Sequence, residues 1–229
     1  MGEIFALACA VTWSLAVILF RRSGETVSAL DLNVFRVVLS SVLFLATLGL
    51  TGRSLLRDLP AGDYLLLVAS GVIAIAVSDT LFHLALNRVG AGINAVVSTL
   101  YAPFTSFFAF VLLRERLGWM QLTGMALIIA GVLVAARLDP PRGSTRRSLV
   151  AGVIYGVFAM ATLGLGIVIA KPVLVHTDVL WATTIRQLGS LLVLAPVALI
   201  LPGRRARLAV FRPQRSWRFT LPGAVLGSY

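Results

Sequence analysis

Residues 149–170 read LVAGVIYGVFAMATLGLGIVIA, a run of 22 positions without a charged side chain. A helix needs about 20 mostly apolar residues to cross the hydrocarbon core of a bilayer. Backbone groups inside lipid must satisfy their hydrogen bonds within their own segment, which favours a helix over a strand. The stretch therefore predicts a membrane-spanning helix.

The rest of the chain repeats this pattern. Similar apolar runs lie at about 4–20, 34–50, 64–86, 93–113, 119–136 and 179–201, and another apolar segment starts at Leu221. Charged residues make up only 13% of the chain and hydrophobic residues 59%, whereas a water-soluble domain carries roughly 25% charged residues. We predict an all-α, polytopic membrane helical bundle of about seven spans.

The net charge of +11 comes mainly from arginines between the apolar runs. Arginines beside membrane helices contact anionic lipid headgroups, so we expect the lipid bilayer as a partner and no nucleic-acid binding. The single cysteine, Cys9, excludes an internal disulfide and a cysteine-based metal site. We expect a multi-pass protein of the cell (inner or plasma) membrane.

An internal repeat is visible at an offset of 150 positions, which aligns Arg21 with Lys171 and Arg36 with Arg186. Basic residues are rare inside such runs, so one offset that aligns two pairs indicates duplication. We predict a five-helix unit, a linker and a second unit that is incomplete, with bounds 1–136, 137–148 and 149–229. Because five is odd, the second unit would enter the membrane from the opposite face, giving an inverted repeat with a midplane substrate site.

A family resemblance accompanies this organisation. The segments that carry it are AGINAVVSTLYAPF at 91–104, LRERL at 113–117, QLTG at 121–124 and IIAGV at 128–132. They closely resemble the end of an EamA domain of the drug/metabolite transporter (DMT) superfamily, and Trp13, Arg36 and Ala85-Leu86 also fit. The resemblance covers 1–136 well and 149–229 more loosely. It implies a ten-helix transporter of two EamA repeats that moves small metabolites or drugs, often outward, whereas this chain holds seven helices and a fragment.

Arg36 and Arg186 each lie a few residues inside a predicted helix. A charge near the bilayer centre costs roughly 3 kcal/mol on insertion scales, so such side chains usually face a cavity or a partner. Their repeat-related positions suggest contact with an anionic substrate group or a gating pair. The alternative is that both side chains snorkel to the nearby interface.

Asp79 and His83 are one helical turn apart and share a helix face. Such a pair could relay a proton and couple transport to a proton gradient, because histidine titrates near neutral pH. The alternative, which the neighbouring Asn87 and Arg88 favour, is an interfacial pair that meets lipid headgroups.

Pro103 lies within the predicted fourth span. Proline removes a helical hydrogen bond and frees a carbonyl near Thr99, and such breaks often line a substrate path in transporters. With Asn94, Ser98 and Tyr101 close by in sequence, we predict a cavity-lining face, and the alternative is a packing kink.

Four further features have simpler interpretations. Trp13 lies in the middle of the first run, where a cavity wall is plausible, and Trp181 is expected in the aromatic belt at the membrane interface. Residues 114–116, Arg-Glu-Arg, predict a locally salt-bridged turn. Gly152 and Gly156 allow close helix packing.

The sequence contains no phosphate loop, zinc-ligand spacing or nucleophile elbow. We therefore expect no enzyme, no catalytic residue, no metal site and no cofactor. The leading hypothesis is a secondary transporter that exports a small-molecule substrate, with a proton or another ion as a coupling partner. The alternative is a membrane scaffold or assembly protein without transport activity. The sequence leaves open the orientation of the N-terminus and the oligomeric state, including a dimer.

Overall fold

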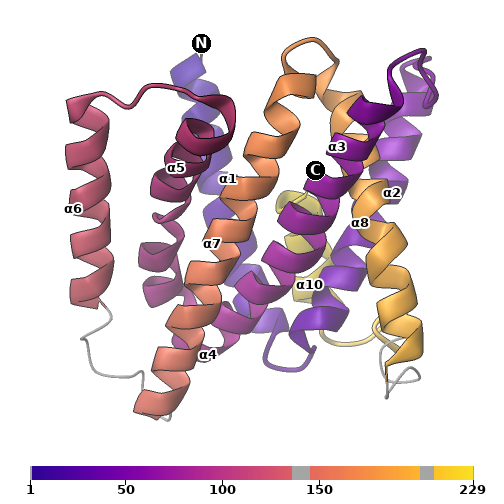
Figure 1. Cartoon of the computed structure of the whole chain (residues 1–229). Coiled ribbons are helices and arrows are strands. Elements are labelled where there is room, and N and C mark those ends of the chain that lie inside the picture. Colours follow the sequence, from indigo (N-terminus) through magenta and orange to yellow (C-terminus); the bar gives the residue numbers. More distant parts are fainter. Residues whose placement is uncertain (1, 136–144, 202–208, 229) are drawn as a thin grey trace.

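The computed structural model describes residues 2–135, 145–201 and 209–228. These residues form a bundle of helices without strands (Figure 1). The elements are α1 (Gly2–Ser23), α2 (Ala29–Leu50), α3 (Ala61–Gly71), the π-helix η1 (Val72–Val77), α4 (Ser78–Ser98), α5 (Tyr101–Leu113), α6 (Trp119–Ala135), α7 (Arg146–Leu174), α8 (Val179–Ile200) and α10 (Trp217–Leu226). The predicted all-α polytopic bundle is confirmed.

Five helical stretches in the described part are long and apolar enough to cross a membrane. Four are α1, α2, α7 and α8, and the fifth is the continuous stretch Ala61–Ser98. That stretch bends at Gly90, whose φ of 76° lies in the left-handed region that favours glycine. The chain reverses there, so that 61–89 crosses in one direction and 91–113 returns through α5 (Figure 1).

Small residues allow α7 to approach its neighbours closely. α7 contacts α3, α4 and α5. A Cβ atom placed on Gly156 would lie 2.7 Å from Val97 Cγ1 of α4, and the Ser78 hydroxyl of α4 donates to the Ala159 carbonyl of α7 at 2.7 Å. Lipid tails are as apolar as leucine, so association in a bilayer depends on such packing and on hydrogen bonds between helices.

The helices of the two predicted units run in opposite directions. In Figure 1, α1 descends while α7 rises, and α2 rises while α8 descends. α1 packs on α10 and α7 packs on α3, so the first helix of each predicted unit contacts the third helix of the other. This arrangement is the one expected of an inverted repeat, which stays a prediction together with its domain bounds.

The predicted linker 137–148 falls largely on residues 136–144, which lie outside the described residues. Its last part belongs to a helix, because α7 begins at Arg146. Thr145 caps this helix, and its hydroxyl accepts from the Ser148 N–H at 3.2 Å. Threonine is a favoured N-cap, so α7 starts at this cap and not at the first residue of the apolar run.

Trp181 does not face the lipid, as a residue of the predicted aromatic belt would. It is fully buried beneath residues 51–60, where its indole N–H donates to the Leu55 carbonyl at 2.8 Å. The ring of Tyr64 packs edge-on against it and the Arg57 guanidinium lies over it, 5.0 Å from the ring centroid. The residue therefore fastens a loop to the ends of α3 and α8.

The predicted local turn at residues 114–116 is also wrong in its partner. Glu115 Oε1 accepts from Lys171 Nζ of α7 at 2.5 Å, so the connection after α5 is tied to a distant helix. Lys171 is 56 positions away in sequence, which local charge pairing cannot anticipate.

Asp178, just before α8, titrates below its ordinary range. The Trp181 backbone N–H donates to its carboxylate at 3.0 Å, and this hydrogen bond, with Arg53 as an ion-pair partner, lowers the pKa of Asp178 from its usual 3.8. A lowered pKa in the folded state adds stability that is complete above the ordinary pKa and is lost as the pH falls through the lowered one.

We therefore expect Asp178→Asn to lose less stability than the parent protein as the pH falls into the acid range. Asparagine keeps the helix cap without titrating, so the parent protein should lose its advantage over the variant as the pH falls below 3.8, the usual pKa of the carboxyl group. Thermal unfolding in detergent, followed across that range for both proteins, measures the difference. Parallel curves would contradict the assignment.

Candidate functional site

A buried ion pair joins α2 to α4. Arg36 of α2 is only 5% exposed, and its guanidinium pairs with the Asp79 carboxylate. It also donates to Asn33 Oδ1 at 3.2 Å and to Ser228 Oγ, just after α10, at 3.1 Å. Arg36 therefore does not snorkel to the interface, and it connects three segments that are distant in sequence.

The π-helix η1 lies beside this pair. Asn33 Nδ2 donates to the Ile75 carbonyl of η1 at 3.0 Å and to Thr80 Oγ1 at 2.9 Å. A π-helix shifts the register of backbone carbonyls, and such bulges are frequent at functional sites. Asn33 was not singled out in the sequence, although an asparagine three residues before a membrane-embedded arginine is a detectable signal.

Arg186 of α8 is buried as well, at 9% exposure. Its Nε donates to Ser70 Oγ of α3 at 2.9 Å, and it interacts electrostatically with the Asp79 carboxylate. Asp79 interacts electrostatically with Arg36 too. The two arginines that the repeat aligns thus act on one carboxylate, a relation that sequence analysis missed.

His83 does not form the expected hydrogen-bonded relay with Asp79. Its ring is 1% exposed and packs edge-on against Phe20 and Phe82, with centroids 4.9 and 5.7 Å away. Within the described residues neither ring nitrogen has a hydrogen-bond partner. The burial of the ring also contradicts the alternative, in which His83 meets lipid headgroups.

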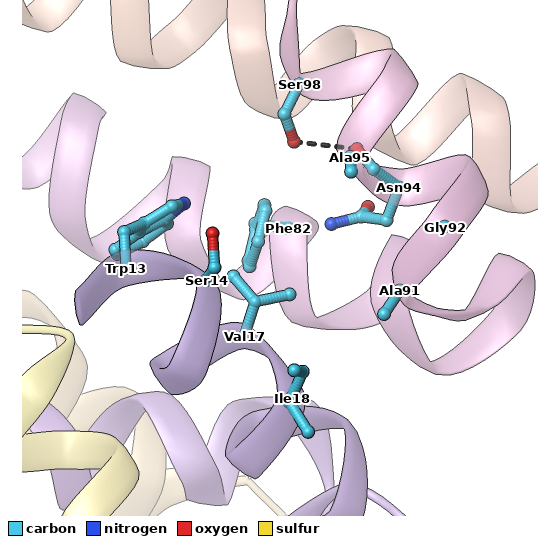
Figure 2. A pocket seen from close by; sticks show the side chains of 10 residues that line it. All are labelled: Trp13, Ser14, Val17, Ile18, Phe82, Ala91, Gly92, Asn94, Ala95 and Ser98. Atoms are coloured by element: carbon cyan, nitrogen blue, oxygen red, sulfur yellow. Dashed lines mark hydrogen bonds between the residues drawn. The ribbon is translucent and has the colours of Figure 1, made fainter. Parts of the chain in front are cut away.

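A cavity of about 370 Å³ opens between α1 and the 91–98 part of α4 (Figure 2). Its aromatic wall is formed by Trp13 and Phe82, whose ring centroids are 5.8 Å apart. Trp13 also borders a cavity of about 170 Å³ next to Tyr101 and one of about 390 Å³ next to Ser228. Trp13 therefore lines all three cavities, and its role in binding a substrate stays a prediction.

Most of the predicted polar face of the fourth span reaches these cavities. Asn94 and Ser98 line the cavity of about 370 Å³, and Ser98 and Tyr101 line the cavity of about 170 Å³. The Ser98 hydroxyl is already satisfied, because it donates to the Asn94 backbone carbonyl at 2.7 Å. Asn94 is therefore the polar side chain most free to serve a ligand.

Thr99 and Pro103 differ from the prediction. Thr99 is exposed, and its hydroxyl donates to the Val96 carbonyl at 2.6 Å, away from the cavity residues. Pro103 is buried in the first turn of α5, where proline is tolerated, and not in the middle of a helix. The Thr99 carbonyl is not freed, because it accepts from the Ala102 N–H at 3.3 Å.

Comparison with known proteins connects this geometry to a family. Residues 1–137, more than half of the chain, match the EamA-like transporter family. The chain belongs to the EamA-like transporter family. EamA membership agrees with the resemblance found in the sequence and with the multi-pass helical bundle.

Two curated relatives resemble this EamA chain. An uncharacterized transporter from Archaeoglobus fulgidus is 25% identical over 170 residues, which cover 71% of this chain and 59% of the relative. A probable terminal-alkyne amino-acid exporter from Streptantibioticus cattleyicolor is 27% identical over 157 residues, which cover 66% and 51%. The EamA chain thus spans between half and three fifths of the length of these relatives.

The cavity of the EamA chain is suited to binding more than to chemistry. Aromatic walls with a few placed polar groups are typical of small-molecule sites. In the described ranges, no three His, Cys, Asp or Glu side chains gather as they would around a metal ion. The buried charged groups Arg36 and Asp79 are paired with each other.

Proposed function

We propose that this chain takes part in the transmembrane transport of small molecules, as an exporter in the plasma membrane with its binding site at Trp13. The observation that carries the proposal is the cavity bordered by Trp13, Phe82 and Asn94 inside a bundle of membrane-crossing helices. The names of the two relatives, a transporter and a probable amino-acid exporter, support it.

The buried contacts suggest how two halves would move against each other. Arg36 of the first predicted unit contacts Ser228 of the second, and Arg186 of the second contacts Ser70 of the first. In an inverted-repeat transporter the halves rock around a central site. We propose that these two arginine contacts form and break alternately as the cavity opens to either face.

Ion coupling stays a prediction within this proposal. Asp79 is placed to respond to a proton, because neutralising its carboxylate would release Arg36 from α4. His83 is buried next to Phe82 of the cavity wall. A proton on His83 would therefore place a positive charge beside that wall.

An export assay tests the function. Cells that express the complete gene product are loaded with metabolites, with amino acids that include a terminal-alkyne one, and with drugs, and the medium is then profiled. We expect Trp13→Ala to slow export of the transported solute about tenfold. Loss of the aromatic contact should weaken substrate binding by about 1.4 kcal/mol, which corresponds to a factor of ten.

The matched control is Trp119→Ala on α6, a tryptophan that is 85% exposed. It should export as the parent does at equal abundance in the membrane. If no solute leaves faster than from cells without the protein, the transport proposal is wrong and the scaffold alternative is favoured.

A further inference from the structure

Asn94 has an unusual position in the wall of the 370 Å³ cavity. Its side chain is 1% exposed, and within the described residues neither Oδ1 nor Nδ2 has a hydrogen-bond partner. Figure 2 shows the amide directed toward Phe82, on the side where Trp13 and Ser14 close the cavity. The unpartnered amide therefore points from the wall toward a space large enough for a small molecule.

An unpaired buried amide destabilises the fold, because its donor and acceptor have lost their hydrogen bonds to water and have gained no others. Such groups are rare in folded proteins, and each one calls for an explanation. Packing does not require it, since leucine has nearly the same size and would avoid the cost. A ligand that pairs with both atoms at once explains the residue.

The chemistry of the amide specifies its complement. A carboxamide or lactam presents an acceptor next to a donor and can pair with Asn94 Nδ2 and Oδ1 together. A carboxylate only accepts and would leave Oδ1 unpaired, whereas an ammonium group only donates and would leave Nδ2 unpaired. Either ion would also bring a charge into the cavity.

The remaining walls disfavour an ion. None of the ten described residues that line this cavity is charged, and burying an unpaired charge is strongly unfavourable. Trp13 and Phe82 instead offer aromatic faces to an apolar or aromatic body.

We infer that this cavity binds an uncharged carboxamide or lactam group, carried on an aromatic or apolar body, through both amide atoms of Asn94. The inference rests on the proposed function, for which it names the class of substrate. It also predicts that this cavity does not bind free amino acids, which carry two charges.

Three probes of the same shape test the inference: benzamide, benzoate and benzylamine. Binding is measured by titration calorimetry on the purified complete protein in lipid nanodiscs at neutral pH. We expect benzamide to bind more tightly than both ions, and Asn94→Leu to weaken benzamide on the order of tenfold to a hundredfold, as the loss of two hydrogen bonds implies. Thr99→Val, on the exposed side of the same span, is the matched control and should bind as the parent does.

Thermal stability provides a second readout. Because leucine removes an unpaired polar group, Asn94→Leu should be at least as stable as the parent while it loses benzamide. A variant that is less stable and still binds benzamide would show that Asn94 has a structural role, and the inference would be wrong.

The preference of the parent protein for benzamide over the two ions can be measured without any variant. Benzoate or benzylamine binding as tightly as benzamide, or no binding of benzamide, would overturn the inference. In that case a persisting effect of Trp13→Ala on export would leave the transport proposal standing, whereas its absence would remove both.

Discussion

An Asp79→Ala variant should lose about 3–5 kcal/mol of stability, the usual effect of removing one partner of a buried ion pair. The cause is the arginine that remains, because Arg36 is 5% exposed and Asp79 is its carboxylate partner. Asn33 and Ser228 would still accept hydrogen bonds from it but cannot neutralise its charge. Unfolding in sodium dodecyl sulfate, followed by circular dichroism of the protein in mixed micelles, measures the loss.

Two further variants sharpen this test. Arg36→Ala should cost less than Asp79→Ala, because the stranded carboxylate still interacts with Arg186. The double variant Arg36→Leu with Asp79→Leu should recover most of the stability, since apolar residues of similar volume often replace a buried pair without loss. An Asp79→Ala protein as stable as the parent would mean that the pair is not buried in the membrane-embedded state.

The helices could be predicted from the sequence because the bilayer sets their length. Each predicted run falls on one helix or on two or three consecutive helical pieces, and the start at Leu221 falls within α10. The reversal at Gly90 matches the gap between two predicted runs. Apolar length carries this information without any tertiary contact.

The partner of Arg36 was missed for a physical reason. Helical spacing placed Asp79 with His83, because that rule considers one helix at a time. Charge balance would have been the better guide: Asp79 is the one acidic residue inside the predicted spans, where Arg36 and Arg186 are the basic ones. Charges in a bilayer pair across helices far more readily than they remain alone.

Side-chain direction was harder to predict than position. Asn94 and Thr99 lie in one polar segment, yet the first is buried at the cavity and the second is exposed. Which side of a span faces the bundle depends on its neighbours, and the polar residues alone did not reveal it. Trp181 shows the same limit, since the loop that covers it comes from a different part of the chain.

A single methyl group at Gly71 should disrupt the crossing of α3 and α8. A Cβ atom built there would lie 2.7 Å from the Arg186 carbonyl carbon and 2.9 Å from its Cα. These are main-chain atoms, so no rotamer change can relieve the overlap, and the helices must separate. We expect Gly71→Ala to lose about 1–3 kcal/mol, in the range of overpacked cores, and Gly71→Val to lose more.

Separation of α3 and α8 would also affect the buried contact between Arg186 and Ser70. Ser70, the neighbour of Gly71, accepts from Arg186 Nε at 2.9 Å, and a displaced α3 would break that bond. The control is Gly124→Ala on α6, where a Cβ atom meets nothing within 4 Å, so helix propensity alone makes it neutral or stabilising. Both variants are compared in the same detergent titration. Equal stability of Gly71→Ala and Gly124→Ala would show that α3 and α8 are farther apart than their backbones indicate, and the contact between Arg186 and Ser70 would then have to be abandoned as well.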